Sequence, residues 1–297
     1  MKRASEKVYA TTEYTNMTAG PRNLDPMPVS PSLHEQAPTP VRARNGSETV
    51  EGIAAFRLAN RPKIELPKNG DNPLVIRGGR SSMAPATDAY KSLRTALTKL
   101  QNGRAISSVV VTSAVPSDGK TLTAFNLACC TAELQDTPVL LIDADLRTHA
   151  LTDLIGKLPH VGLAEVLKGT ASYEDAMVGT DIPNLYVMGA GDGDTASVEL
   201  FSTDRWAHFM RWASESFKLV LVDSLPVGIV ADFDLISAQC DGVLVVVRAL
   251  YTPQAAVLKA IGQIDPKKVI GVVWNGDQHL SKNYYDHDVY TARAGKG

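Results

Sequence analysis

The sequence is short of several features that would place it in a particular class of protein. It has only three cysteines in 297 residues. All three lie inside apolar segments, which is typical of reduced packing residues and not of disulfides or metal ligands. No apolar run approaches the ~18 residues that a membrane-spanning helix needs. The first residues, Met-Lys-Arg-Ala-Ser-Glu, lead into polar sequence and lack the apolar core of a signal peptide. We therefore expect a cytoplasmic protein.

A strong charge of either sign is also missing. The formal net charge is −2, and the sequence pI is about 6.3. This balance argues against a partner that is bound through bulk electrostatics, so we expect no nucleic acid partner. The length gives ample material for the core of one large domain.

Tryptophan and a regular apolar period are absent from the first 82 residues. Nine of the 17 prolines fall before Arg80, among many Thr, Asn, Ser and Glu residues. This composition predicts a disordered, proline-rich N-terminal arm over residues 1–82. We expect a folded domain over residues 83–276 and a flexible, tyrosine-containing tail over residues 277–297.

One phosphate-binding loop stands out in the middle of the chain. An apolar strand pattern over residues 108–112 runs into Ser113-Ala-Val-Pro-Ser-Asp-Gly-Lys-Thr121, and a helix-compatible stretch follows over 122–134. This is the order of a P-loop, in which N–H groups at a helix N-terminus cradle the phosphates and Lys120 reaches the β and γ oxygens. Thr121 can place its hydroxyl on Mg²⁺. The residues predicted to contact the nucleotide are Ser117, Asp118, Gly119, Lys120, Thr121 and Leu122.

Two further apolar strand patterns end in carboxylates. Residues 139–142 lead into Asp143-Ala-Asp145, and residues 219–222 lead into Asp223. The carboxyl ends of parallel strands meet at the edge of the sheet where ligands bind. The sequence therefore predicts a site for a nucleoside triphosphate with magnesium.

Strand and helix patterns alternate through the rest of the domain. The predicted strands are residues 109–112, 139–142, 185–188, 219–222, 242–247 and 269–273, and the predicted helices begin near residue 84 and at 122, 163, 204, 234 and 253. The strands are apolar almost throughout, which is typical of strands buried on both faces. We expect an α/β fold of the P-loop NTPase type, with a parallel sheet and helices on both faces.

Several strings together resemble the bacterial tyrosine autokinases, the cytoplasmic kinases of capsule and exopolysaccharide export. Asp88-Ala-Tyr-Lys-Ser-Leu-Arg94 is similar to their Glu-Ala-Tyr-Arg-Ser-Leu-Arg helix, and the P-loop is similar to Thr-Ser-Ala-Val-Pro-Gly-Glu-Gly-Lys-Ser, in which Ala114 is normal. Leu141-Ile-Asp-Ala-Asp-Leu-Arg147 resembles the Walker A′ motif, and Val222-Asp-Ser-Leu-Pro226 is a variant of the Walker B string. The resemblance covers about residues 84–276.

The resemblance implies an ATP- and Mg²⁺-dependent protein-tyrosine autokinase that regulates exopolysaccharide or capsule polymerisation and export. Asp143 would act on the metal or as the base toward a tyrosine hydroxyl, with Asp145 close by. Asn275 resembles the adenine-reading Asn of related P-loop ATPases, although it could also cap a turn. The implied catalytic residues are Lys120, Asp143, Asp145 and Asp223, and the implied metal ligands are Thr121, Asp143 and Asp223.

Three positions depart from the family pattern in ways that matter for the site. Ser117 replaces a loop glycine, which is tolerable if its φ is negative. Leu225 replaces the first proline of the Walker B turn. Lys91 replaces an arginine and cannot form a bidentate fork, so subunit contacts through this helix could be weaker or different.

The tail carries the predicted phosphoacceptors Tyr284, Tyr285 and Tyr290. Three of nine tyrosines in the last 14 residues is more than uniform placement gives, but incidental exposed aromatics are the other interpretation.

The resemblance also implies partners. Asp88, Lys91 and Arg94 would dock against a neighbouring subunit near its P-loop and form a ring, although these charges also suit an ordinary amphipathic helix. A separate transmembrane chain-length (co-polymerase) protein would hold the kinase at the inner face of the cell membrane.

Two other functions stay open at this point. The sparse tyrosine tail and altered Walker B turn also suit a nucleotide-dependent scaffold, a co-polymerase subunit or pseudokinase with little tyrosine chemistry. A ParA/MinD-like ATPase is the third option. Those relatives carry an additional lysine five positions before the P-loop lysine, where this chain has Val115.

Overall fold

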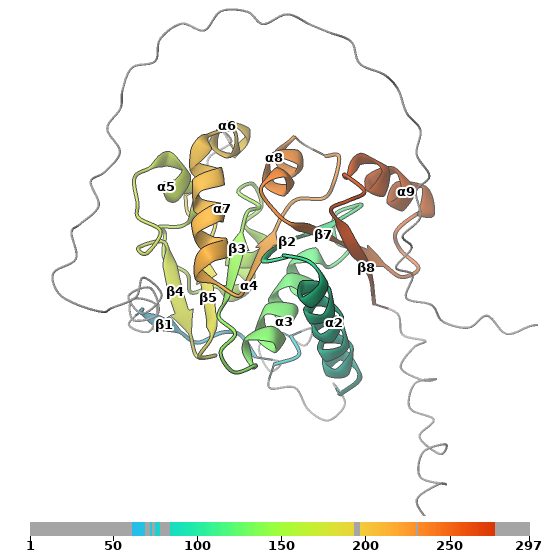
Figure 1. Ribbon diagram of the computed structural model, residues 1–297, viewed down its shortest axis with the longest axis horizontal. Helices are drawn as coiled ribbons and strands as arrows, with labels where there is room; N and C mark the ends of the chain where they lie inside the picture. The colour runs from blue at the N-terminus through green and yellow to red at the C-terminus, as the bar shows by residue number, and fades with distance from the viewer. Residues whose placement is uncertain are drawn as a thin grey trace, which may run out of the picture. The chain divides into compact units, whose positions relative to one another are not determined.

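The computed structural model describes residues 61–68, 72, 75–77, 84–192, 197–229 and 231–276 (Figure 1). Most of the predicted N-terminal arm and the whole of residues 277–297 lie outside the described residues. The predicted phosphoacceptors Tyr284, Tyr285 and Tyr290 therefore have no structural account here.

The described residues build an eight-stranded sheet of order β1-β4-β5-β3-β6-β2-β7-β8. The strands are β1 (Lys63–Ile64), β2 (Ser108–Ser113), β3 (Val139–Asp143), β4 (Met177–Thr180), β5 (Leu185–Met188), β6 (Leu219–Asp223), β7 (Gly242–Arg248) and β8 (Val269–Asn275). Neighbours pair in parallel except β4 and β5, which are antiparallel. The predicted α/β fold is confirmed, but β1 and β4 run antiparallel to the other six strands.

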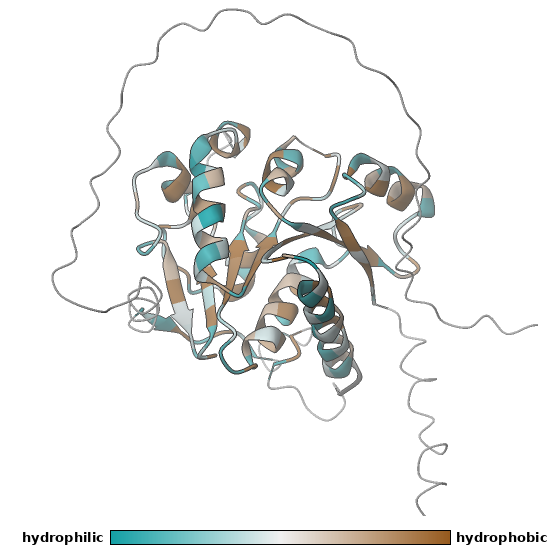
Figure 2. Cartoon of the chain, in the orientation of Figure 1, coloured by the Kyte–Doolittle hydropathy of each residue, from teal (hydrophilic) through white to brown (hydrophobic). Residues whose placement is uncertain are grey.

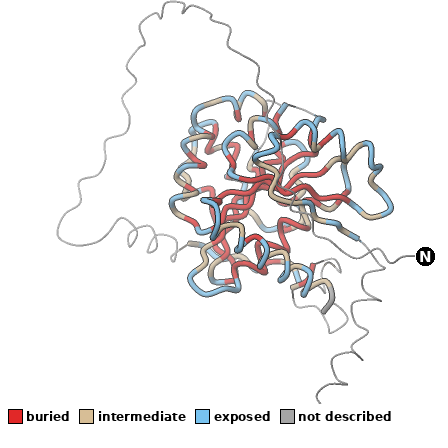
Figure 3. Tube along the Cα trace, turned by 45° about the vertical axis from the view of Figure 1, so that its right-hand side comes forward, coloured by how far each residue is buried: buried red, intermediate tan, exposed pale blue. Residues whose placement is uncertain are grey.

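The central strands are buried on both faces because their residues alternate between two apolar layers (Figure 3). In β3, Leu140 and Ile142 belong to one core cluster, whereas Val139 and Leu141 belong to the other. The sequences of such strands are continuous apolar runs, and this is why these strands could be predicted from the sequence.

Helices cover both layers of the sheet (Figure 2). One layer is packed by α2, α3 and α4, and the other by α5 to α9. The helices are α2 (Ala84–Gly103), α3 (Lys120–Ala132), α4 (Ala150–Ile155), α5 (Leu163–Lys168), α6 (Ser197–Phe201), α7 (Asp204–Ser216), α8 (Asp232–Ala238) and α9 (Gln254–Gln263). None of the helices within the described ranges is long and apolar enough to cross a membrane.

A short segment N-terminal to residue 83 also belongs to the fold. β1 pairs with β4, and Leu66 and Val75 are buried in the layer that holds α3. The Arg77 guanidinium forms an ion pair with Asp181 and donates a hydrogen bond to the Leu66 carbonyl at 2.9 Å. Long-range pairing therefore orders residues whose local composition resembles that of the arm.

Candidate phosphoryl-transfer site

The P-loop connects β2 to α3 through a sharp backbone turn. Gly119 precedes the helix with φ +93°, and a Cβ built there would lie 2.2 Å from the Asn275 side-chain nitrogen. Both the left-handed backbone and the close approach require glycine at this position. The N–H groups of the first turn of α3 have no acceptor within the helix, so they are available to a phosphate.

Ser117 also lies in the left-handed region, with φ +66°. The condition for tolerating a serine here, a negative φ, is therefore not met. Arg248 Nη1 donates to the Ser117 carbonyl at 3.3 Å, so the strained residue is held from outside the loop. A Cβ in this region costs about 1 kcal/mol, which the surrounding contacts must offset.

Asp118 is fully buried, and its side chain braces the loop. Its Oδ1 accepts a hydrogen bond from the Thr252 hydroxyl at 2.6 Å, and its Oδ2 accepts one from the Val115 N–H at 3.4 Å. Asn275 donates its side-chain amide to the Asp118 carbonyl at 2.8 Å. Asn275, at the end of β8, thus lies against the P-loop, and its predicted contact with adenine stays a prediction. Sequence reasoning missed Thr252 because its partner is 134 residues away.

Lys120 lies at the centre of the predicted site. Its Nζ is 3.4 Å from Asp145 Oδ2, 3.7 Å from Asp223 Oδ1 and 3.2 Å from the Thr121 hydroxyl. The structure therefore brings together the lysine and the two carboxylates that the sequence placed at the ends of separate strands. Leu122 follows in the first turn of α3, where its half-exposed side chain packs against the apolar layer.

Asp223 is completely buried at the end of β6, and neither of its carboxylate oxygens has a hydrogen-bond partner among the described residues. Burial raises the pKa of Asp223 to about 7. Lys120 opposes this rise and the negative charge of Asp143 adds to it. The Lys120 ammonium at 3.7 Å offsets part of the cost of burying this carboxylate, and a bound cation would offset more of it.

Asp143 is equally buried but has donors. Its Oδ2 accepts from the Thr152 N–H at 2.8 Å and the Thr152 hydroxyl at 2.7 Å, and its Oδ1 accepts from the Asp145 N–H at 3.2 Å. Burial raises the pKa of Asp143, and the hydrogen bonds from Thr152 oppose that rise. Thr152 is a site residue that sequence reasoning missed, because nothing in its local pattern marks it as a ligand of Asp143.

These residues fit a magnesium ion that is held together with phosphate. No group of three or more His, Cys, Asp or Glu side chains in the described residues could hold a metal alone. Magnesium in nucleotide sites usually keeps several waters and takes only one or two protein carboxylates plus phosphate oxygens. The Asp223 carboxylate and the Thr121 hydroxyl beside it supply that kind of partial set.

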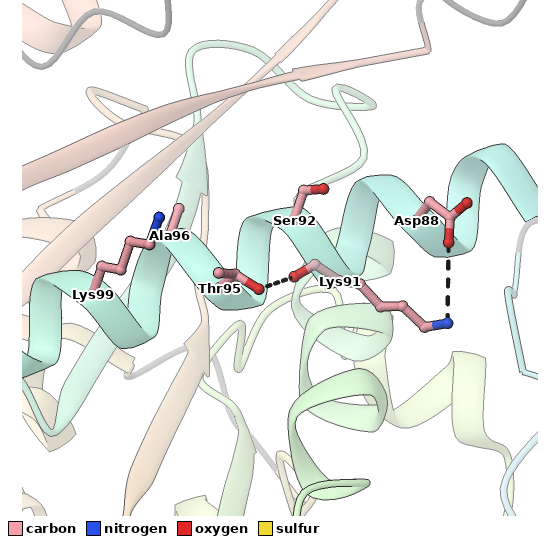
Figure 4. Close-up of a pocket in the computed structure, with 6 residues that line it drawn as sticks. All are labelled: Asp88, Lys91, Ser92, Thr95, Ala96 and Lys99. Atoms are coloured by element: carbon pink, nitrogen blue, oxygen red, sulfur yellow. Dashed lines mark hydrogen bonds and ion pairs between the residues drawn. The ribbon is translucent and has the colours of Figure 1, made fainter. Parts of the chain in front are cut away.

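The charged residues of α2, the predicted docking helix, differ in their exposure and in their partners. Asp88 and Lys91 are exposed and form an ion pair at 4.0 Å. Arg94 is half-buried and donates to the Cys130 carbonyl of α3 at 2.7 Å, so it packs within its own subunit. A pocket on the outer face of α2 is lined by Asp88, Lys91, Ser92, Thr95, Ala96 and Lys99 (Figure 4). The subunit contact itself stays a prediction.

A parallel sheet, a glycine-lysine-threonine loop and carboxylates at two strand ends define a P-loop nucleotide-binding protein. No protein-family model matches the chain. The chain is 31% identical to tyrosine-protein kinase YwqD of Bacillus subtilis over 204 residues, which are 67% of this chain and 86% of the relative. It is 28% identical over 291 residues to the succinoglycan biosynthesis transport protein ExoP of Rhizobium meliloti, covering 93% of this chain and 35% of that protein.

Among solved structures, the kinase domain of the Escherichia coli tyrosine kinase ETK matches with a TM-score of 0.64 and 25% identity, over 73% of this chain and 82% of that domain. The chain thus spans most of YwqD and of the ETK domain, but only about a third of ExoP. The chain belongs to the bacterial tyrosine-protein kinase family.

Proposed function

We propose that this chain is an ATP- and Mg²⁺-dependent tyrosine autokinase that regulates exopolysaccharide or capsule polymerisation and export. The observation that carries the proposal is the cluster of Lys120, Asp145 and Asp223, in which Asp223 keeps two donor-free oxygens. The kinase names of its relatives, and the succinoglycan name of ExoP, agree with this function.

The chemistry that this arrangement supports is positioning and charge neutralisation, which is most of what phosphoryl transfer requires. Lys120 would exchange its contact with Asp145 for the phosphate oxygens of ATP. Asp223 and Thr121 would hold Mg²⁺, which supplies neutralisation of the phosphate charge when it is bound. Asp118 and Asn275 would keep the P-loop in shape during this exchange.

The phosphoryl group would pass from ATP to a tyrosine hydroxyl of the tail. The bond between the γ-phosphorus and the bridging oxygen breaks, ADP leaves, and a new bond forms to the tyrosine oxygen. The phenolic proton would go to Asp143 or Asp145. Both oxygens of Asp143 already accept hydrogen bonds, but a carboxylate has about four acceptor positions, so Asp143 keeps the capacity to take part.

The test is incubation with ATP and Mg²⁺, followed by mass spectrometry for phosphotyrosine at Tyr284, Tyr285 and Tyr290. We expect labelling in the wild type and none in Lys120→Met. Lys259→Met, at an exposed position of α9, is the matched control and should label normally. A wild-type protein that binds ATP but forms no phosphotyrosine would refute the kinase function.

The scaffold alternative is distinguished by a variant in which all three tail tyrosines are phenylalanine. A scaffold predicts unchanged polysaccharide output from this variant, whereas an autokinase that acts through its tail predicts a loss. In the Walker B turn the Leu225 carbonyl accepts a hydrogen bond from the Thr112 hydroxyl at 2.7 Å, which supports the turn without the family's first proline. The half-buried Val115 lies where ParA/MinD-type ATPases carry their additional lysine.

The remaining assignments belong to the same proposal. A transmembrane co-polymerase protein, as a separate chain, would hold the kinase at the inner face of the membrane, and the α2 face with Asp88 and Lys91 would contact a neighbouring subunit in a ring. The division into an arm, a kinase domain and a tyrosine tail also remains a prediction. Light scattering with ATP and Mg²⁺ tests the ring. If the ring forms through this face, the wild type should have a larger mass than Asp88→Ala.

A further inference from the structure

A further buried carboxylate, that of Asp232, lies outside the set described so far. Asp232, the first residue of α8, is completely buried. It accepts hydrogen bonds from Arg147 Nε at 3.2 Å and Nη2 at 3.4 Å, and from the Ser197 hydroxyl at 2.5 Å. One carboxylate therefore joins the turn after β3, the start of α6 and the start of α8.

Arg147 belongs to the same turn as Asp145. The Asp145 carbonyl accepts the His149 N–H at 2.9 Å, and Asp145 Oδ1 accepts the Thr148 N–H at 3.0 Å. The other oxygen of Asp145 faces Lys120. The backbone of Arg147 is thus enclosed by the hydrogen bonds that orient Asp145, while its guanidinium is anchored on Asp232.

We propose that Arg147 and Asp232 are positioning residues for the phosphoryl-transfer site. Their ion pair fixes the turn over residues 145–149, so that Asp145 stays within reach of the Lys120 ammonium. This role rests on the proposed function, because Lys120 and Asp145 are assigned to phosphoryl transfer there. Neither Arg147 nor Asp232 touches the reacting atoms in this scheme.

The pair links parts of the chain that the sheet alone does not fix. β3 and β6 are adjacent strands, and the segments that follow them lead to different helices, α4 and α8. The Ala144 N–H donates to the Asp223 carbonyl at 2.9 Å, which holds the strand ends together. In addition, the bidentate contact of Arg147 with Asp232 holds the turn after Asp145 against α8.

The burial of the two partners also favours a geometric role. The Arg147 side chain is 35% exposed, whereas Asp232 is not exposed at all. A guanidinium is planar and fixes direction as well as distance, which a lysine ammonium does not do. Loss of this direction would let Asp145 move, and a displacement near 1 Å can lower a rate by about 10²-fold.

The experiment compares Arg147→Gln, Asp232→Asn and the double variant with Arg77→Gln. Arg77 forms an ion pair with Asp181, far from the P-loop in sequence and packed in the β1 region, so it is a matched structural control. For phosphoryl transfer we expect kcat to fall about 10- to 100-fold in each single variant, with KM for ATP changing less than threefold. The kcat of the double variant should be no lower than that of the slower single variant, because the two residues act as a unit. Arg147→Lys should recover only part of the rate.

A second readout is independent of kinase activity. Lys120 is only 9% exposed and is held by Asp145 in the nucleotide-free protein. Acylation by an amine-reactive ester, followed by mass spectrometry, reports how freely this lysine moves. We expect Lys120 labelling to rise at least threefold in both single variants, while the exposed Lys91 labels at an unchanged rate and Arg77→Gln leaves both rates unchanged.

The outcomes separate this proposal from the proposed function. If the wild type makes no phosphotyrosine but Lys120 labelling rises as expected, the kinase function fails and the positioning role stands. If both variants lower the melting temperature like Arg77→Gln while kcat and Lys120 labelling stay within twofold of wild type, the pair is only structural. If Arg147→Gln slows transfer and Asp232→Asn does not, Arg147 acts on the ligand directly and the proposal is wrong.

Discussion

The ends of β3 and β6 hold the same residue type at paired positions but with different hydrogen-bond partners. Asp143 and Asp223 are register partners on adjacent parallel strands, and both are completely buried. Asp143 accepts three hydrogen bonds from Thr152 and Asp145, whereas neither oxygen of Asp223 has such a partner in the described residues. Strand geometry brings the two carboxylates together, and the chain that follows each strand decides what each can do.

The difference arises just beyond the strands. After β3 the chain turns back, so that the first turn of α4 aims the Thr152 N–H and hydroxyl at Asp143. After β6 the chain continues beside β2, where the Val227 N–H donates to the Ser113 carbonyl at 2.9 Å, and the Ser224 hydroxyl donates to the Val111 carbonyl instead of to Asp223. Asp143 is thus built into the protein, while Asp223 is left for a cation.

The largest effect is expected when the Asp223 carboxylate is replaced by an amide. Asp223→Asn should lower phosphoryl transfer at least 100-fold and weaken the Mg²⁺ dependence of nucleotide binding, because the proposed metal ligand is lost. Without nucleotide, the variant should melt at or above the wild-type temperature at pH 8, because a buried carboxylate without donors has been removed. Titration calorimetry with ADP, with and without Mg²⁺, and thermal melts measure both effects.

Asp143→Asn is the matched control for that substitution. Its amide nitrogen would face N–H donors, so this variant should lose stability where Asp223→Asn does not. Equal melting temperatures for the two variants would contradict the assigned difference between the strand ends.

The pH dependence of stability sharpens the same comparison. The pKa of Asp223 is raised to about 7 in the folded protein, against a usual value of 3.8. The folded state therefore binds the proton more tightly than the unfolded state, and this contribution to stability is fully present below about pH 4. It is lost as the pH rises through about 7, and we expect a loss on the order of 1–3 kcal/mol.

The measurement is urea unfolding without metal or nucleotide between pH 5.5 and 8. The wild type should lose stability over this range, and Asp223→Asn should lose less. Parallel curves for the two proteins would mean that Asp223 does not titrate in this window.

A smaller effect is expected at Thr152. Thr152→Val removes a hydroxyl that donates to Asp143 and accepts the Ala190 N–H at 3.0 Å, while keeping the shape of the side chain. We expect unfolding to be easier by about 1–2 kcal/mol, because two buried polar groups each lose one partner. Thr148→Val, at an exposed position in the preceding turn, should change stability by less than about 0.5 kcal/mol. Urea melts of both variants check the difference.

The sequence predicted the parts of this site that depend on local order. The apolar runs of β2, β3 and β6 and the residues after them placed Lys120, Asp143 and Asp223 at one edge of a sheet, because parallel strands share a carboxyl edge. β4 was missed because its sequence, Met-Val-Gly-Thr, is interrupted by a glycine, whereas β5, of equal length, is apolar or aromatic throughout. β1 was missed because two residues in a polar segment become a strand only through pairing with β4.

The side chains that support the site could not be predicted in the same way. Asp232 pairs with Arg147 across 85 positions, and Thr252 contacts Asp118 across 134. No local periodicity reports such a contact, because it depends on how loops from different strands meet. Arg94 is the opposite case. Its charge predicted a contact with another subunit, but its guanidinium donates to a carbonyl of α3 in the same chain.

The smallest expected effect is at Ser117, where the P-loop backbone itself is strained. At φ +66° the Cβ costs about 1 kcal/mol, whereas glycine costs about 0.5–1 kcal/mol through the entropy of the unfolded chain. These terms nearly cancel, so Ser117→Gly should change the free energy of unfolding by no more than about 0.5 kcal/mol, in either direction. Gly119→Ala is the matched opposite: at φ +93° its new methyl group would meet the Asn275 amide, so stability and nucleotide affinity should both fall clearly. Urea melts and ADP titrations measure both variants. A Ser117→Gly protein that is less stable by 1 kcal/mol or more would mean that the serine side chain itself supports the loop.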